Sequence, residues 1–80
     1  MSPTVLRQSG YVVVVFGNDH PPAHVHVRAA GNVARVRLQP IALMDSYGFT
    51  SRQLRAIMAI VEANLSVCLA KWDEIHPEGR

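Results

Sequence analysis

Apolar residues in the first half of the chain occur in short runs, and turn-forming residues separate these runs. The runs are rich in valine and have the length of strands, with Gly, Pro, Asn or Asp between them. We therefore predict four strands, at about residues 4–7, 11–16, 24–29 and 33–38. The second of them is apolar on both faces, which indicates a central strand rather than an edge. The short connections predict an antiparallel meander.

In the second half, apolar residues recur at intervals of three and four, which is the period of an amphipathic helix. Thr50 is a suitable N-cap, and Gln53 stands at the capping-box position. The apolar stripe consists of Leu54, Ile57, Met58, Val61, Leu65, Cys68, Leu69 and Trp72. We predict one helix over about residues 51–73, preceded by a turn at Asp45-Ser46-Tyr47-Gly48. The predicted fold class is α+β, a small antiparallel β-meander packed against one long C-terminal α-helix, in a single domain over residues 1–80.

A single helix covers only one face of a sheet, so this architecture leaves apolar surface without a partner. Ile60 and Val67 lie off the main stripe of the predicted helix. We expect their side of the helix to form a contact with another chain. The protein is therefore expected to form a homo-oligomer, such as a dimer, or a hetero-complex.

Side chains alternate across a strand, so His24, His26 and Arg28 should share one face, with Arg35 and Arg37 beside them. If Gly31-Asn32 forms a two-residue turn, Arg28 lies opposite Arg35, and His26 lies opposite Arg37. Opposed like charges cost up to about 1 kcal/mol per pair. We therefore expect a carboxylate such as Asp45, a partner protein or a phosphate backbone to offset them, unless the guanidinium groups extend into water. The candidate anion-binding residues are Arg28, Arg35 and Arg37.

Asp19, His20, His24 and His26 form the densest group of titratable residues in the sequence. The three histidines are candidates for acid–base catalysis on a phosphodiester, because an imidazole titrates near neutral pH. Together with Asp19 they are also the ligand types of a divalent transition metal such as zinc. A cationic Arg37 opposite His26 would repel a metal ion. We therefore expect no cofactor and no tightly bound structural metal, with metal binding by these four residues as the alternative.

The remaining candidate groups have structural interpretations. Cys68 and Trp72 lie on the apolar stripe and are expected in the core, whereas His76 is expected at the surface near the C-terminus. No phosphate-binding glycine loop, nucleophile elbow or pair of metal-binding cysteines occurs in the sequence.

Composition restricts the class of protein. Hydrophobic residues make up 49% and charged residues 18% of the chain, which excludes intrinsic disorder. The longest apolar run, Tyr11 to Phe16, is too short to span a membrane. One cysteine cannot form an internal disulfide, and Met1-Ser2-Pro3-Thr4 does not begin a secretory signal, so we expect a cytoplasmic protein. Eight Lys and Arg against six Asp and Glu give a net charge of +2, and seven of the eight cations are arginine. Arginine favours carboxylate and phosphate partners.

Several of these motifs together resemble a family of small bacterial proteins, the domain of unknown function 4160. The resemblance is most specific at Asn18-Asp19-His20 and His24-Val25-His26-Val27. It extends to the segments Pro3 to Leu6, Asp45 to Gly48, Ser51 to Arg55 and Glu62 to Trp72. The chain departs from the usual family pattern at Ala23 and Val25, where proline and an aromatic residue are usual, but keeps all three histidines.

The resemblance implies a neighbour-encoded small protein as partner, in a gene layout similar to toxin–antitoxin pairs. One hypothesis is therefore a toxin-side component that acts on RNA, with the histidines as acid and base and the arginines holding phosphates. The alternative is a non-catalytic binding module, whose basic sheet face docks an acidic partner protein or nucleic acid, or a histidine-based metal-binding protein.

Overall fold

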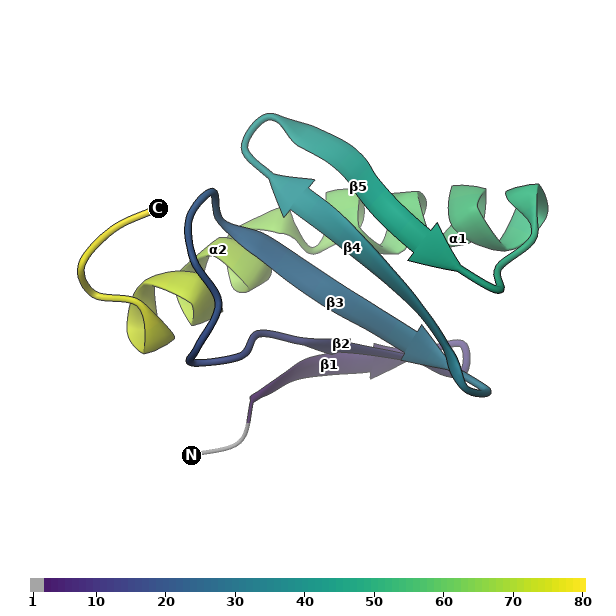
Figure 1. Ribbon diagram of the computed structural model, residues 1–80, viewed down its shortest axis with the longest axis horizontal. Coiled ribbons are helices and arrows are strands. Elements are labelled where there is room, and N and C mark those ends of the chain that lie inside the picture. The colour runs from purple at the N-terminus through teal and green to yellow at the C-terminus, as the bar shows by residue number, and fades with distance from the viewer. Residues whose placement is uncertain (1–2) are drawn as a thin grey trace.

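The computed structural model describes residues 3–80, and it has five antiparallel strands and two helices. The strands neighbour one another in sequence order, and both helices lie on one side of the sheet (Figure 1). The elements are β1 Thr4–Gln8, β2 Tyr11–Val14, β3 His24–Ala29, β4 Asn32–Leu38, β5 Ile41–Tyr47, α1 Ser51–Ala63 and α2 Leu65–Ile75. The predicted α+β class and the meander are confirmed. The expectation about a signal sequence rests in part on residues 1–2, which lie outside the described residues.

The core lies between the sheet and the helices. Alternate residues of β3 and β4, among them Val25, Val27 and Val36, are fully buried and face this core. Ile57 and Trp72 contribute from the helices and are also fully buried. Each such side chain contributes about 1.5–3 kcal/mol of hydrophobic free energy. The opposite face of the sheet, which carries the candidate site, has no helix over it (Figure 1).

β5 corrects the prediction for the segment before the helix. Asp45, Ser46 and Tyr47 were expected in a turn, but they belong to a fifth strand that pairs with β4. Its register shifts between Arg35 and Val36 of β4, as at a β-bulge. The bulge interrupts the alternation of polar and apolar side chains, which explains why no strand pattern was visible in this segment.

The β3–β4 turn lies one residue earlier than predicted. Ala29 pairs with Asn32, so the turn residues are Ala30 and Gly31, both with positive φ. Positive φ at both positions is the requirement of a type I′ turn, and alanine rarely adopts it. The pairing across β3 and β4 therefore differs by two residues from the predicted one, and each side chain keeps its face.

The predicted single helix is two helices, and their axes are bent by 74° at Asn64. The Asn64 side-chain amide donates to the Ile60 carbonyl oxygen at 2.8 Å, and asparagine commonly competes with helical hydrogen bonding in this way. The predicted Thr50–Gln53 capping box is present at the start of α1. Ile60, which was expected at an intermolecular contact, is only 6% exposed within the chain, whereas Val67 is 50% exposed.

No single helix among residues 3–80 has the length and apolar character needed to cross a membrane. Only the bent pair α1 and α2 taken together reaches that length and composition.

Candidate metal centre

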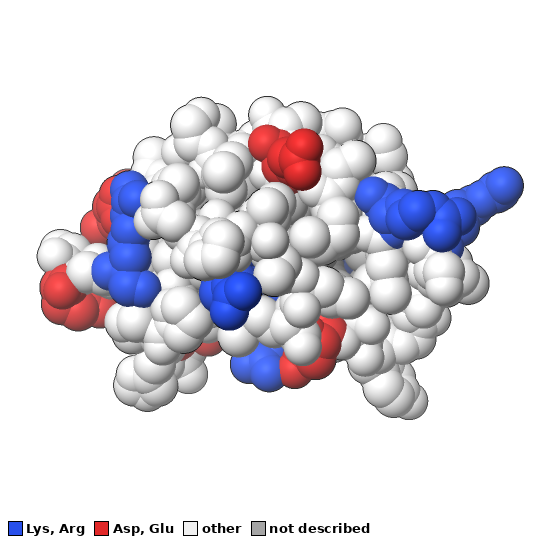
Figure 2. Space-filling view, turned by 90° about the horizontal axis from the view of Figure 1, so that it is seen from above, with Lys and Arg blue, Asp and Glu red and all other residues white. Residues whose placement is uncertain are grey.

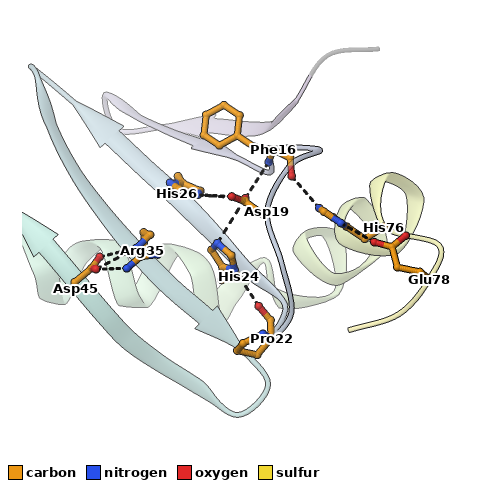
Figure 3. Close-up of polar contacts among 9 residues, drawn as sticks. All are labelled: Phe16, Asp19, Pro22, His24, His26, Arg35, Asp45, His76 and Glu78. Carbon is orange, nitrogen blue, oxygen red and sulfur yellow. Dashed lines mark hydrogen bonds and ion pairs between the residues drawn. The ribbon is translucent and has the colours of Figure 1, made fainter.

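Asp19, His24 and His26 meet at one end of the central strand, where the β2–β3 loop folds back over the start of β3 (Figure 3). Asp19 Oδ2 lies 3.2 Å from His26 Nε2 and 3.5 Å from His24 Nε2. One nitrogen or oxygen from each of the three residues lies within 4.8 Å of the other two. We refer to these three residues as the Asp-His-His site.

The Asp19 carboxylate is oriented by a short turn that begins at Phe16. The Phe16 N–H donates to Asp19 Oδ2, and the Asp19 N–H donates to the Phe16 carbonyl oxygen, each at 3.3 Å. The Phe16 ring packs edge-on against His26, with 4.8 Å between the ring centroids. The turn thus holds the carboxylate over the two imidazoles.

The orientation of the His24 ring is fixed by a hydrogen bond at Nδ1, the nitrogen that does not face Asp19. His24 Nδ1 lies 2.9 Å from the Pro22 carbonyl oxygen, which can only accept, so Nδ1 carries the proton of this hydrogen bond. In the neutral ring, Nε2 then has a lone pair directed toward the Asp19 carboxylate, which is also an acceptor. Two acceptors 3.5 Å apart need a cation between them, either a proton or a metal ion. A carbonyl partner on the second nitrogen is also the usual arrangement of a metal-bound histidine.

His26 faces the open side of the sheet, and its side chain is 18% exposed. Burial lowers the pKa of His26 below its ordinary value of 6.5, and the nearby Asp19 carboxylate opposes this effect. His24 and Arg35 lower the same pKa to a smaller extent. The neutral ring, which is the form that binds metals, is therefore favoured near neutral pH.

The arginines do not form the opposed pairs that were predicted. Arg28 pairs with Val33, whereas Arg35 lies opposite His26 and Arg37 opposite His24. Arg35 makes a two-pronged ion pair with Asp45, whose pKa is lowered chiefly by this hydrogen bond. Arg37 donates to the Pro40 carbonyl oxygen at 3.0 Å.

These pairings change the electrostatic argument against a metal ion. The cation next to His26 is Arg35 rather than Arg37, and a carboxylate neutralises it. The repulsion expected at His26 is therefore weakened, whereas Arg37, which has no carboxylate partner among residues 3–80, lies opposite His24. The expectation that no structural metal is bound stays a prediction. On the side of the molecule seen in Figure 2, cations and carboxylates are dispersed, some as adjacent pairs, with uncharged side chains between them.

The family of the chain follows from a sequence match. The model of the family called Domain of unknown function (DUF4160) matches residues 10–73, which is more than half of the chain. The chain belongs to this family. No curated protein and no solved structure gives a significant match. The DUF4160 match includes the complete Asp-His-His site and ends before His76.

His20 was predicted with the other histidines, but its side chain is exposed in the β2–β3 loop. Among residues 3–80, the group whose ligand atoms converge consists of Asp19, His24 and His26 without His20. The loop directs Asp19 inward and leaves its neighbour in solvent. His20 is therefore a natural reference residue for experiments on the site.

His76 was predicted at the surface, and this is wrong, because it is only 2% exposed. Its Nε2–H donates to the Phe16 carbonyl oxygen at 2.8 Å, and its ring stacks on Trp72 with 3.9 Å between centroids. The Trp72 ring in turn lies 5.4 Å from that of His24. His76 thus supports the turn that orients Asp19. Phe16 and His76 are 60 positions apart, and the sequence gives no sign of this contact.

Cys68 takes no part in the site. It is fully buried in the core, and burial raises the pKa of its thiol to about 11. A thiol with such a pKa is not a nucleophile or a metal ligand at neutral pH.

Proposed function

We propose that the protein binds a divalent transition metal ion, such as zinc, through Asp19, His24 and His26. The observation that carries this proposal is that His24 Nε2 and His26 Nε2 converge on one oxygen of Asp19, while His24 Nδ1 is hydrogen-bonded to the Pro22 carbonyl oxygen. With metal–ligand bonds of about 2.1 Å, neighbouring ligand atoms of a tetrahedral zinc site lie about 3.4 Å apart. The distances of 3.2 and 3.5 Å from Asp19 Oδ2 to the two imidazole nitrogens support this size of ion.

Two imidazoles and one carboxylate leave coordination positions for water or a substrate, as in catalytic rather than structural metal sites. His26 is partly exposed and contributes to a hollow on the open face that Arg35 and Tyr47 also line. A metal-bound water at this position would be acidified and available to react with a ligand in that hollow. We therefore propose a reactive metal site.

Zinc titration of protein purified without a histidine tag, in competition with a chromophoric chelator, tests the proposal. We expect one zinc ion per chain. Asp19→Asn and His26→Asn should each weaken binding by about 100-fold or more, since each removes a ligand. The matched control is His20→Asn, which removes an exposed imidazole from the same loop and should leave the affinity unchanged. Absence of stoichiometric zinc binding, or equal losses in the control, would disprove the site.

The fold should form without the ion, because Asp19 and His24 already have protein partners in Phe16 and Pro22. After a chelator removes the ion, the protein should remain folded and should still show a cooperative thermal transition, at a lower melting temperature. Free zinc at about 100 times its dissociation constant would stabilise the folded state by about 2.7 kcal/mol.

A second candidate function is the one that the family resemblance suggests, a toxin-side component that cleaves RNA with His24 and His26 as acid and base. The support for it is that the two imidazole rings lie 5.3 Å apart, with Asp19 beside both. This activity would persist in EDTA, whereas metal-dependent activity would not. Expression with and without the neighbour-encoded protein would test the partner, because a toxin inhibits growth only when its partner is missing.

A further inference from the structure

The open face of the sheet carries a row of side chains that crosses all five strands. Consecutive pairs in the sheet register place these residues side by side on one face, because directly paired residues of antiparallel strands point the same way. In order from β1 to β5, the row consists of Arg7, Val12, Arg28, Val33 and Tyr47. We call this set the cross-strand row. It is separate from the Asp-His-His site.

The two arginines of the cross-strand row have no carboxylate partner among residues 3–80. This distinguishes Arg7 and Arg28 from Arg35 and Arg80, which pair with Asp45 and Asp73. Both are exposed, and they line one hollow together with Val12, Val33 and the turns at Gly10 and Gly31. Arg28 also lies over the Phe16 ring at 5.8 Å from its centroid. Two unpaired guanidinium groups in one hollow attract an anion.

The far end of the cross-strand row is aromatic. Tyr47 is 74% exposed, which makes it the most exposed of the large hydrophobic side chains in the described part of the chain. It borders a second hollow, together with Val33, Arg35 and His26. An exposed aromatic ring beside cations is typical of sheets that stack nucleic-acid bases and hold their phosphates.

We propose that the cross-strand row binds single-stranded nucleic acid, with Arg7 and Arg28 on phosphates and Tyr47 stacked on a base. Neighbouring strands lie about 4.8 Å apart, so the row spans about 19 Å, which accommodates a few nucleotides of an extended strand. The valines between the arginines provide apolar contact for bases or sugars. An acidic peptide would also be attracted by the arginines, but it has no base to stack on the exposed Tyr47 ring. The proposal does not depend on a bound metal ion.

Fluorescence anisotropy of the full chain with a labelled oligouridylate of about eight nucleotides tests the proposal. An oligothymidylate of the same length shows whether the sugar is recognised. Both titrations contain EDTA, so that a failure of the metal site does not affect them. With two phosphate contacts, the logarithm of the affinity should fall against the logarithm of the salt concentration with a slope of about −1.4.

Arg7→Ala and Arg28→Ala should each weaken binding several-fold and reduce the slope to about −0.7, because each removes one phosphate contact. The matched control is Arg52→Ala in α1, which removes the same charge from the helical side of the molecule. Tyr47→Ala should cost roughly tenfold, the size of one base–aromatic stack, and Tyr47→Phe should restore the affinity.

Three results would overturn the proposal. Equal losses for Arg52→Ala and Arg28→Ala would mean that only net charge attracts the oligonucleotide. Unchanged affinity in Tyr47→Ala, with full competition by polyglutamate, would assign the surface to an acidic protein. The third result is the absence of binding at low salt by the unmodified chain. None of these results bears on zinc affinity, which the Asp19 and His20 variants measure separately.

Discussion

His24 and His76 are both almost completely buried, and both contact Trp72, yet their hydrogen bonding differs. His24 is 4% exposed and His76 is 2% exposed. Both ring nitrogens of His76 have close acceptors, the Phe16 carbonyl oxygen at 2.8 Å and Glu78 Oε1 at 3.0 Å. His24 has one such partner, the carbonyl of Pro22, and its Nε2 faces the Asp19 carboxylate at 3.5 Å. Burial alone therefore does not separate a structural histidine from a candidate metal ligand.

What separates them is the carboxylate partner, which lies 3.0 Å from His76 but 3.5 Å from His24, where His26 shares it. The second acceptor of His76, Glu78, is an exposed carboxylate, and the His76 ring stacks on the Trp72 indole. At His24, one oxygen of the Asp19 carboxylate faces the Nε2 atoms of both His24 and His26. At His76 the surrounding chain supplies every partner. At His24 the second partner is shared, and the ligand atoms of Asp19, His24 and His26 converge within 4.8 Å of one another.

The largest effect is expected from His76→Ala. The substitution removes a buried ring and leaves the Phe16 carbonyl without its donor, so unfolding should become easier by about 3 kcal/mol. Urea denaturation measures this loss. Zinc stoichiometry should remain at one ion per chain, because no ligand is removed. A loss below about 1 kcal/mol would contradict the structural role of His76.

Asp19→Asn should have the opposite profile in the metal-free protein. Asp19 Oδ2 faces both His24 Nε2 and the Phe16 N–H, so the asparagine atom at this position either donates to His24 or accepts from Phe16. The gain of one hydrogen bond offsets the loss of the other, and we expect the free energy of unfolding to change by no more than about 1 kcal/mol. The variant should no longer be stabilised by zinc. A strong destabilisation of the metal-free variant would show that the carboxylate is needed for folding, as in a closed structural cluster.

The sequence indicated the residues of the Asp-His-His site, but it did not indicate the contacts of His76. Asp19, His24 and His26 lie within eight consecutive residues, and strand alternation places the two histidines on one face. His76 contacts Phe16 across 60 residues, and its position beyond the helix was typical of a surface residue. A long-range hydrogen bond leaves no periodic pattern in a sequence.

The errors in the predicted fold, by contrast, each have a local structural cause. Valine-rich strands and the capped helix start were predictable, because their signals depend on neighbouring residues. The bulge in β5 hid a strand, and the positive φ of Ala30 shifted a turn that glycine and asparagine were expected to form. Asn64 bends the helical segment without a proline or glycine to indicate it.

A smaller effect on stability and on zinc affinity is expected from pH, and it should come from His26 in the Asp-His-His site. Its pKa is lowered by burial, so the folded protein binds fewer protons than the unfolded chain between that lowered value and 6.5. Stability should therefore decrease as the pH falls through this window, and zinc affinity should decrease with it, because protons compete for the imidazole. Zinc titrations between about pH 5 and 8 measure the effect. His26→Asn should remove this part of the pH dependence, and an unaltered dependence would exclude His26 as its source.

The smallest effect is expected at Glu78, the exposed partner of His76. Its side chain is 63% exposed, so water and salt screen its interaction with the imidazole. In Glu78→Gln the side-chain amide can hydrogen-bond to His76 Nδ1 as donor or acceptor, and the melting temperature at neutral pH should remain within error of that of the unmodified chain. The pKa of Glu78 is lowered by a hydrogen bond to its own backbone and then by His76, so its contribution is present above the unfolded pKa and is lost as the pH falls through the lower folded value. Acid denaturation of the unmodified chain should therefore contain a component that Glu78→Gln lacks. A large loss of stability at neutral pH would instead show that the structure around His76 depends on the Glu78 charge.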